Sequence, residues 1–139
     1  MEVSKNKSPR LASTIGWAAR ILDILAIAFI SLFALDVFSE GAGLGQKIVA
    51  FLLHMIPSFV LIIFLIIAWK HELVGGILIT LIGLTSSTYV YSLNFGRSHS
   101  VSRGLQTAAM IGAPFVIAGL LFMISDFLHR PKTLPAQTR

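Results

Sequence analysis

The sequence predicts an all-α, polytopic membrane protein in which four transmembrane helices form a bundle with both termini in the cytoplasm. Three observations support this prediction. The chain is 55% hydrophobic and only 12% charged, which is far from the balance of soluble globular proteins. Two long uncharged segments, 48–69 and 73–93, flank the short polar stretch Lys70-His71-Glu72. Basic residues gather near alternate ends of the apolar segments, as they do in membrane proteins.

Four segments are long enough to cross a bilayer, at about residues 21–39, 48–69, 73–93 and 104–125. The second contains 22 residues, which make roughly 33 Å of helix at about 1.5 Å per residue. Because only three residues join the second segment to the third, these two helices must be antiparallel neighbours. The chain is then a single membrane domain, residues 1–139, in which we expect 1–10 and 131–139 to be flexible tails.

The first segment follows a basic stretch, as the apolar core of a signal peptide does. Its apolar run is too long for that role, it contains Asp23, and no A-x-A-like cleavage site follows. We therefore expect a retained helix. The glycines and lysine of 40–47 do not have the spacing of a phosphate loop, so this stretch is expected to be a hairpin loop.

Two further features concern the connections and the helix geometry. Pro57 lies inside the second segment and predicts a kink near His54, because proline removes one helical hydrogen bond. Residues 94–103 are polar and basic, and we expect them to form the loop between the third and fourth helices.

Small residues recur on one face of each of the last two helices. Close backbone approach is the main attraction between helices in a bilayer, and small side chains permit it. The predicted packing residues are Gly76, Thr80, Gly83 and Ser87 in the third helix and Ala108, Gly112 and Gly119 in the fourth.

Orientation follows from the distribution of lysine and arginine. Eight of the 11 basic residues lie in the terminal segments or the middle turn, and three lie in the first and third loops. Basic residues favour the cytoplasmic side, so the asymmetry predicts that both termini are cytoplasmic.

Charged residues gather at the predicted cytoplasmic boundary: Arg20, Asp23, Lys70, His71 and Glu72. Asp23 follows Arg20 by three residues, so the two lie on one helix face. One interpretation is an interfacial ion pair of Asp23 with Arg20 or with Lys70. The other is a role for Asp23 in transport, because ionisable residues within membrane helices often serve ion or proton pathways.

Asp36 and His54 are the candidate polar cluster of the opposite half. They come from antiparallel neighbours and lie at similar depths. One hypothesis is that they face inward and couple to handle a proton or a ligand. The alternative is that Asp36 reaches the surface while His54 bonds a backbone carbonyl on a neighbouring helix.

No motif for catalysis or for cofactor or metal binding is present in the sequence. The four histidines are not spaced three or four residues apart, and the chain has no cysteine. There is no G-x-S-x-G motif. We therefore expect no enzyme activity and no cofactor. The net charge of +5 is spread over the ends of the apolar segments, which favours membrane orientation over nucleic-acid binding.

Three stretches resemble a family of small, uncharacterised prokaryotic membrane proteins with four predicted spans. They are LDILA at 22–26, SLFALDVF at 31–38 and HMIPSFVLIIFLIIAWKHELVGGIL at 54–78. The likeness covers residues 20–80 and fades beyond them. It implies a prokaryotic origin and a four-span layout, and it implies no chemistry.

Two functional hypotheses remain open. The first is a non-enzymatic protein of the prokaryotic cytoplasmic membrane that works through helix contacts, as a homo-oligomer or as the accessory subunit of a larger membrane protein. The alternative is an oligomeric transporter or channel for protons, ions or small solutes. The lipid bilayer is a partner in both.

Overall fold

The computed structural model describes residues 7–39, 43–98 and 100–130, and all elements in this part of the chain are helical. The elements, in order, are α1 (Lys7–Phe33), the 3-10 helix η1 (Ala34–Ser39), α2 (Leu44–Lys70), α3 (Glu72–Ser98) and α4 (Val101–His129). The four α-helices are long and apolar enough to cross a membrane. The prediction of an all-α chain with four such helices is therefore confirmed.

The helices extend beyond the apolar segments that predicted them. α1 begins at Lys7, so the last four residues of the expected N-terminal tail are helical. α3 continues to Ser98, and the expectation of a loop over 94–103 is wrong for most of that range. Hydropathy marks where a segment stops being apolar, whereas a helix continues as long as its backbone hydrogen bonds can form. Residues 1–6 and 131–139, the rest of the two expected tails, lie outside the described residues.

The remaining connections are as short as the sequence predicts, or shorter. α2 begins at Leu44, inside the expected loop 40–47, and includes Pro57 within one helix. The kink near His54 stays a prediction. The turn between α2 and α3 consists of His71, whose amide donates to the carbonyl of Ile67 at 2.7 Å.

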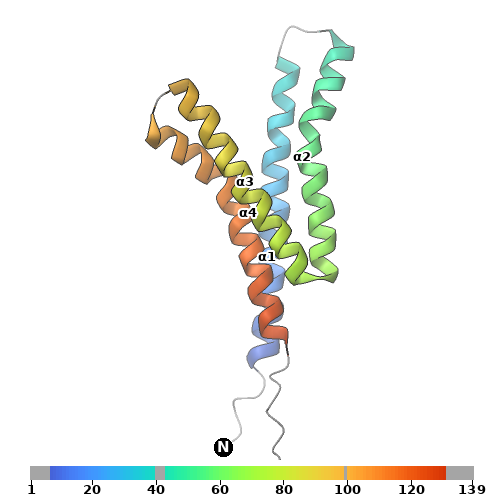
Figure 1. Ribbon diagram of the computed structural model, residues 1–139. Helices are drawn as coiled ribbons and strands as arrows, with labels where there is room; N and C mark the ends of the chain where they lie inside the picture. Colours follow the sequence, from blue (N-terminus) through green and yellow to red (C-terminus); the bar gives the residue numbers. More distant parts are fainter. Residues whose placement is uncertain (1–6, 40–42, 99, 131–139) are drawn as a thin grey trace, which may run out of the picture.

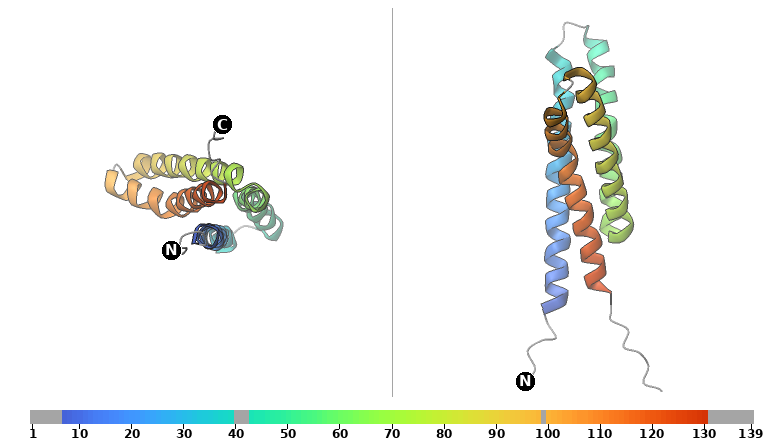
Figure 2. Two further views of the ribbon diagram at one scale, coloured as in Figure 1. Left: turned by 90° about the horizontal axis from the view of Figure 1, so that it is seen from below. Right: turned by 60° about the vertical axis from the view of Figure 1, so that its left-hand side comes forward.

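The four helices form two hairpins, α1–α2 and α3–α4, that pack against each other at one end only (Figure 1). We call this the terminal end, because α1 begins there, α4 ends there and the α2–α3 turn lies there. Towards the opposite end, the loop end, the α3–α4 hairpin tilts away from α1 and α2, as the second set of views also shows (Figure 2). Contacts link α3 with α4, α4 with α1, α1 with α2 and α2 with α3.

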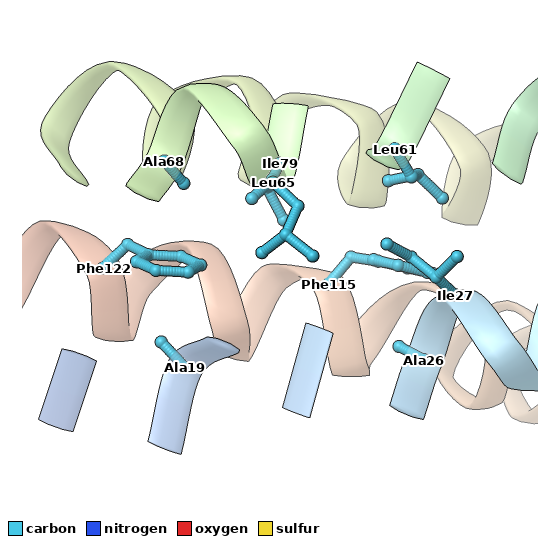
Figure 3. Packing of buried hydrophobic residues seen from close by; sticks show 9 residues of the cluster. All are labelled: Ala19, Ala26, Ile27, Leu61, Leu65, Ala68, Ile79, Phe115 and Phe122. Atoms are coloured by element: carbon cyan, nitrogen blue, oxygen red, sulfur yellow. The ribbon is translucent and has the colours of Figure 1, made fainter. Parts of the chain in front are cut away.

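The apolar core lies where the two hairpins meet (Figure 3). Phe115 and Phe122 of α4 are its largest side chains and are almost completely buried. Phe122 lies between Ala68 of α2 and Ala19 of α1, where small side chains leave room for the ring. The rest of the cluster comprises Ala26, Ile27, Leu61, Leu65 and Ile79.

Candidate functional site

A group of charged and polar side chains lies at the terminal end, where α1, α3 and α4 meet. Arg20 donates from Nη2 to Oε1 of Glu72 at 3.0 Å, and Nδ1 of His129 lies 3.6 Å from Oε2 of the same carboxylate. Glu72 therefore lies between an arginine and a histidine from two other helices. We call Arg20, Glu72, Ser125 and His129 the terminal-end cluster.

The helix ends favour these charges. Glu72 is the first residue of α3, where the helix dipole stabilises an anion, and His129 is the last residue of α4, where it stabilises a cation. Gly16 of α1 gives the group its space, because a Cβ atom there would lie 3.0 Å from Oε1 of Glu72 and 2.9 Å from Oγ of Ser125.

Ser125 joins α4 to α1 within the cluster. Its hydroxyl is buried and donates to the carbonyl oxygen of Ala12 at 3.0 Å. Nδ1 of His129 lies 3.0 Å from the carbonyl oxygen of Ser125. A carbonyl oxygen only accepts, so Nδ1 carries the hydrogen in this contact and Nε2 is left to accept a proton.

Asp23 follows Arg20 by three residues in α1 and is unusual, because it is completely buried and neither of its carboxyl oxygens has a hydrogen-bond partner among the described residues. Neither expected ion pair of Asp23, with Arg20 or with Lys70, is formed in the described part of the chain, and the guanidinium of Arg20 turns to Glu72 instead. Nε of Arg20 is also buried without a partner in the described part of the chain. The physical reason is tertiary packing, which brings the carboxylate of Glu72, at the start of α3, to 3.0 Å from Nη2 of Arg20.

A groove connects the cluster to the surface. It has a volume of about 460 Å³ and is lined by Trp69, Lys70, His71, Glu72, Leu73, Val74, Asp126, His129 and Arg130. Glu72 and His129 are thus members of both the cluster and the groove. Lys70 and His71, also predicted at this boundary, lie on the groove wall. Asp126 and Arg130 form an ion pair of their own at 2.8 Å.

On the loop-end side, the apolar core closes off Asp23. Ile27, one helical turn further along α1, belongs to that core together with Leu61. The next buried polar group is the Ser31–Ser58 pair, whose hydroxyl oxygens lie 3.0 Å apart. Ala19, one helical turn towards the terminal end, belongs to the same core, and Asp23 is not among the residues that line the groove. Packed apolar side chains therefore lie on both sides of Asp23 along α1.

The structure places Asp36 and His54 on the surface. Nδ1 of His54 lies 2.8 Å from the carbonyl oxygen of Ala50 in its own helix, and the side chain is exposed. Asp36 is also exposed and lines a shallow hollow with Phe29, Leu32 and Phe33. His54 therefore bonds a carbonyl oxygen of its own helix, so the expected bond to a neighbouring helix is wrong. The coupling of Asp36 with His54 stays a prediction.

The small residues of α3 and α4 lie against one another. A Cβ atom on Gly76 would lie 2.7 Å from the carbonyl oxygen of Gly119, and one on Gly83 would lie 3.1 Å from that of Gly112. Cβ atoms on Gly112 and Gly119 would collide with the hydroxyls of Ser87 and Thr80. The hydroxyl of Ser87 also lies 3.3 Å from the carbonyl oxygen of Ala108.

Sequence reasoning misses some of the residues that shape this end. Ser125 and Gly16 are not among the candidates it yields, and it identifies no role for His129 beyond that of a polar residue near the boundary. A partial signal exists, because Ser125 and His129 are four residues apart and so share a helix face. Gly75 is also missed, although a Cβ atom there would overlap the backbone of Ala68 in α2.

Comparison with known proteins gives one match. A family model described as "Domain of unknown function (DUF7670)" matches residues 6–134. No curated protein and no solved structure matches the chain. The matched range contains the whole terminal-end cluster and agrees with the resemblance to an uncharacterised family.

Proposed function

Since the chain belongs to the DUF7670 family of unknown function, we propose that it is an integral protein of a prokaryotic cytoplasmic membrane that acts through helix contacts rather than catalysis. The partner is a second copy or a larger membrane protein. The observation that carries this proposal is the exposure of α2. Its buried residues, Ser58, Leu61, Leu65 and Ala68, all lie in its second half.

Among the described residues, none in the first half of α2 is buried, yet this half is strongly apolar. Ile48, Val49, Leu52, Leu53 and Ile56 are each about half exposed. In water such a surface would drive aggregation. In a bilayer it suits lipid and the helices of another membrane protein.

Single cysteines offer a direct test, because the natural chain contains none. We expect Leu53→Cys, at the exposed face of α2, to form specific crosslinks to the partner in membranes. Leu61→Cys, which is buried, and Phe127→Cys, which is exposed near the terminal end, are the controls. A crosslinking yield at Leu53→Cys no higher than at Phe127→Cys contradicts the proposed contact surface.

The second candidate function is an oligomeric proton, ion or solute transporter, and the buried carboxyl of Asp23, without a partner among the described residues, favours it. The apolar core beyond Asp23 gives one chain no polar path across the described bundle, so several copies would have to build the path together. Native mass spectrometry of the detergent-solubilised protein distinguishes the two functions. A homogeneous homo-oligomer supports the transporter, whereas a co-purified larger protein supports the accessory subunit.

A further inference from the structure

The groove at the terminal end exists because α4 extends past the start of α3. Gly76 of α3 lies against α4, where a Cβ atom on it would be 2.7 Å from the carbonyl oxygen of Gly119. At about 1.5 Å per residue, α4 continues for roughly 15 Å beyond this contact, to His129, whereas α3 starts only about 6 Å away, at Glu72. The last turns of α4 therefore form a wall beside the α2–α3 turn (Figure 1).

The charged side chains of the groove leave one positive charge unmatched. Both of its carboxylates are paired, Glu72 with Arg20 at 3.0 Å and Asp126 with Arg130 at 2.8 Å. Lys70 lines the same groove, is exposed, and forms no hydrogen bond or ion pair with another described residue. Once the two pairs cancel, the charge of Lys70 remains. The groove therefore favours an anion.

Two more side chains of the groove can donate hydrogen bonds to such an anion. Arg130 uses Nε in its bond to Asp126, so its other guanidinium N–H groups are left to donate. The side chain of His71 is exposed and has no partner among the described residues, and a neutral imidazole donates from one ring nitrogen. We call Lys70, His71 and Arg130 the groove donors. A phosphodiester carries one negative charge and accepts hydrogen bonds, so it matches both the charge and the donors.

An apolar surface continues from the groove along α3. Val74 lines the groove, and Val74, Ile77 and Leu81 are each about half exposed. Their offsets of three and seven residues place them on one face of the helix, which runs from the groove towards the loop end. Trp69, also about half exposed, lines the groove and is the kind of aromatic residue that lies at the level of lipid headgroups. The site thus has a polar part and an apolar part, as an amphiphile does.

We propose that this groove binds an anionic phospholipid, with the phosphodiester at the groove donors and an acyl chain along the apolar face of α3. The groove volume of about 460 Å³ lies within the range of roughly 300–1,000 Å³ that is usual for small-ligand sites. The excess of lysine and arginine predicts that the terminal end is cytoplasmic, and the cytoplasmic leaflet carries anionic lipids. The proposal goes beyond the partner role above and does not rest on it, because the exposed half of α2 lies at the loop end.

Quenching of tryptophan fluorescence by brominated lipids tests the proposal, because bromine quenches an indole only at close range. The chain has two tryptophans, Trp17 in α1 and Trp69 at the groove. Trp17→Phe leaves Trp69 as the reporter, and Trp69→Phe leaves Trp17. The full-length protein is placed in vesicles of equal parts phosphatidylglycerol and phosphatidylcholine, with one of the two lipids brominated at a time. The ratio of the two quenching values gives the preference of each reporter position for the anionic lipid.

At Trp69 we expect a preference for phosphatidylglycerol of about fivefold, the factor that one basic residue contributes at an anionic membrane surface. In the Trp17→Phe background, Lys70→Gln should remove the preference, whereas Lys70→Arg keeps the charge and should retain it. Arg103→Gln removes the same charge from an exposed position at the loop end and should leave the preference unchanged. Lys70 is exposed and unpaired among the described residues, so its replacement should leave the circular dichroism spectrum unchanged.

Three results overturn the proposal. One is an equal preference at Trp17 and Trp69, which would show a diffuse attraction of the whole terminal end for anionic lipid. Another is a preference at Trp69 that survives Lys70→Gln. The last concerns inorganic phosphate, added in excess against sodium chloride of the same ionic strength. Phosphate should leave the preference unchanged, and a loss specific to phosphate would assign the groove to a soluble phosphate instead of a lipid.

Discussion

Among individual positions, Gly75 faces the tightest steric constraint in the described part of α3. A Cβ atom there would overlap the backbone of Ala68, which lies across the short α2–α3 turn. Backbone atoms cannot yield as a flexible side chain can. We expect Gly75→Ala to lower the free energy of unfolding by about 1–3 kcal/mol or more, as overpacking does.

Gly96 is the matched control, because it lies in the same helix and is free of such contacts. Among the described residues, no atom outside its own stretch of helix lies within 4 Å of the position that a Cβ atom would take. Gly96→Ala is expected to raise stability by about 0.5–1 kcal/mol, since alanine loses less backbone entropy on folding. Unfolding in mixed detergent micelles, followed by circular dichroism, measures both variants. Similar free energies of unfolding for the two variants would show that α2 and α3 can move apart enough to accept the added methyl group.

The partnership of Arg20 illustrates what sequence can and cannot predict about single residues. The i, i+3 spacing correctly places Arg20 and Asp23 on one face, and the α2–α3 turn correctly brings Glu72 to the same boundary. Which carboxylate takes the guanidinium depends on the rotation of α3 against α1. That rotation is set by tertiary packing, including the space left by Gly16, and no local pattern encodes it.

Between α3 and α4, the contact depends on glycines that allow the backbones to approach. A Cβ atom on Gly83 would lie 3.0 Å from Cβ of Phe115 and from the amide nitrogen of Val116. We expect Gly83→Leu to destabilise the bundle by about 1–3 kcal/mol. Leu81 is 54% exposed, so Leu81→Ala removes little packing and should cost well under that amount. Equal tolerance of the two changes in detergent unfolding would argue against this contact.

Apolar patterns in the sequence do not predict where the helices end. The apolar segment of the third helix ends near Leu93, yet α3 continues to Ser98. Asn94 donates from its side-chain amide to the carbonyl oxygen of Val90 at 2.9 Å, so a polar residue here supports the helix rather than ending it. Hydropathy therefore identifies the four helices and their order, while their ends depend on hydrogen bonding that polarity does not report.

For the molecule as a whole, the orientation in the membrane is predicted from the sequence alone. The start of α1 and the end of α4 lie at the same end of the bundle (Figure 1). The excess of lysine and arginine at that end predicts that it is cytoplasmic. A reporter active only after export, fused after Arg139, should be inactive. An active fusion at this position, with a fusion in residues 40–42 inactive, would invert the assigned orientation.

Because the two hairpins diverge, a small rotation where they pack produces a larger displacement at their loop-end tips. Each hairpin is a stiff pair of helices of about 40 Å, held to the other near one end. A rotation of about 10° at the packed end, over a free arm of roughly 20 Å, moves the tip of a hairpin by about 3.5 Å. The spacing between the two loop-end tips is therefore the distance that a small rotation at the packed end changes most.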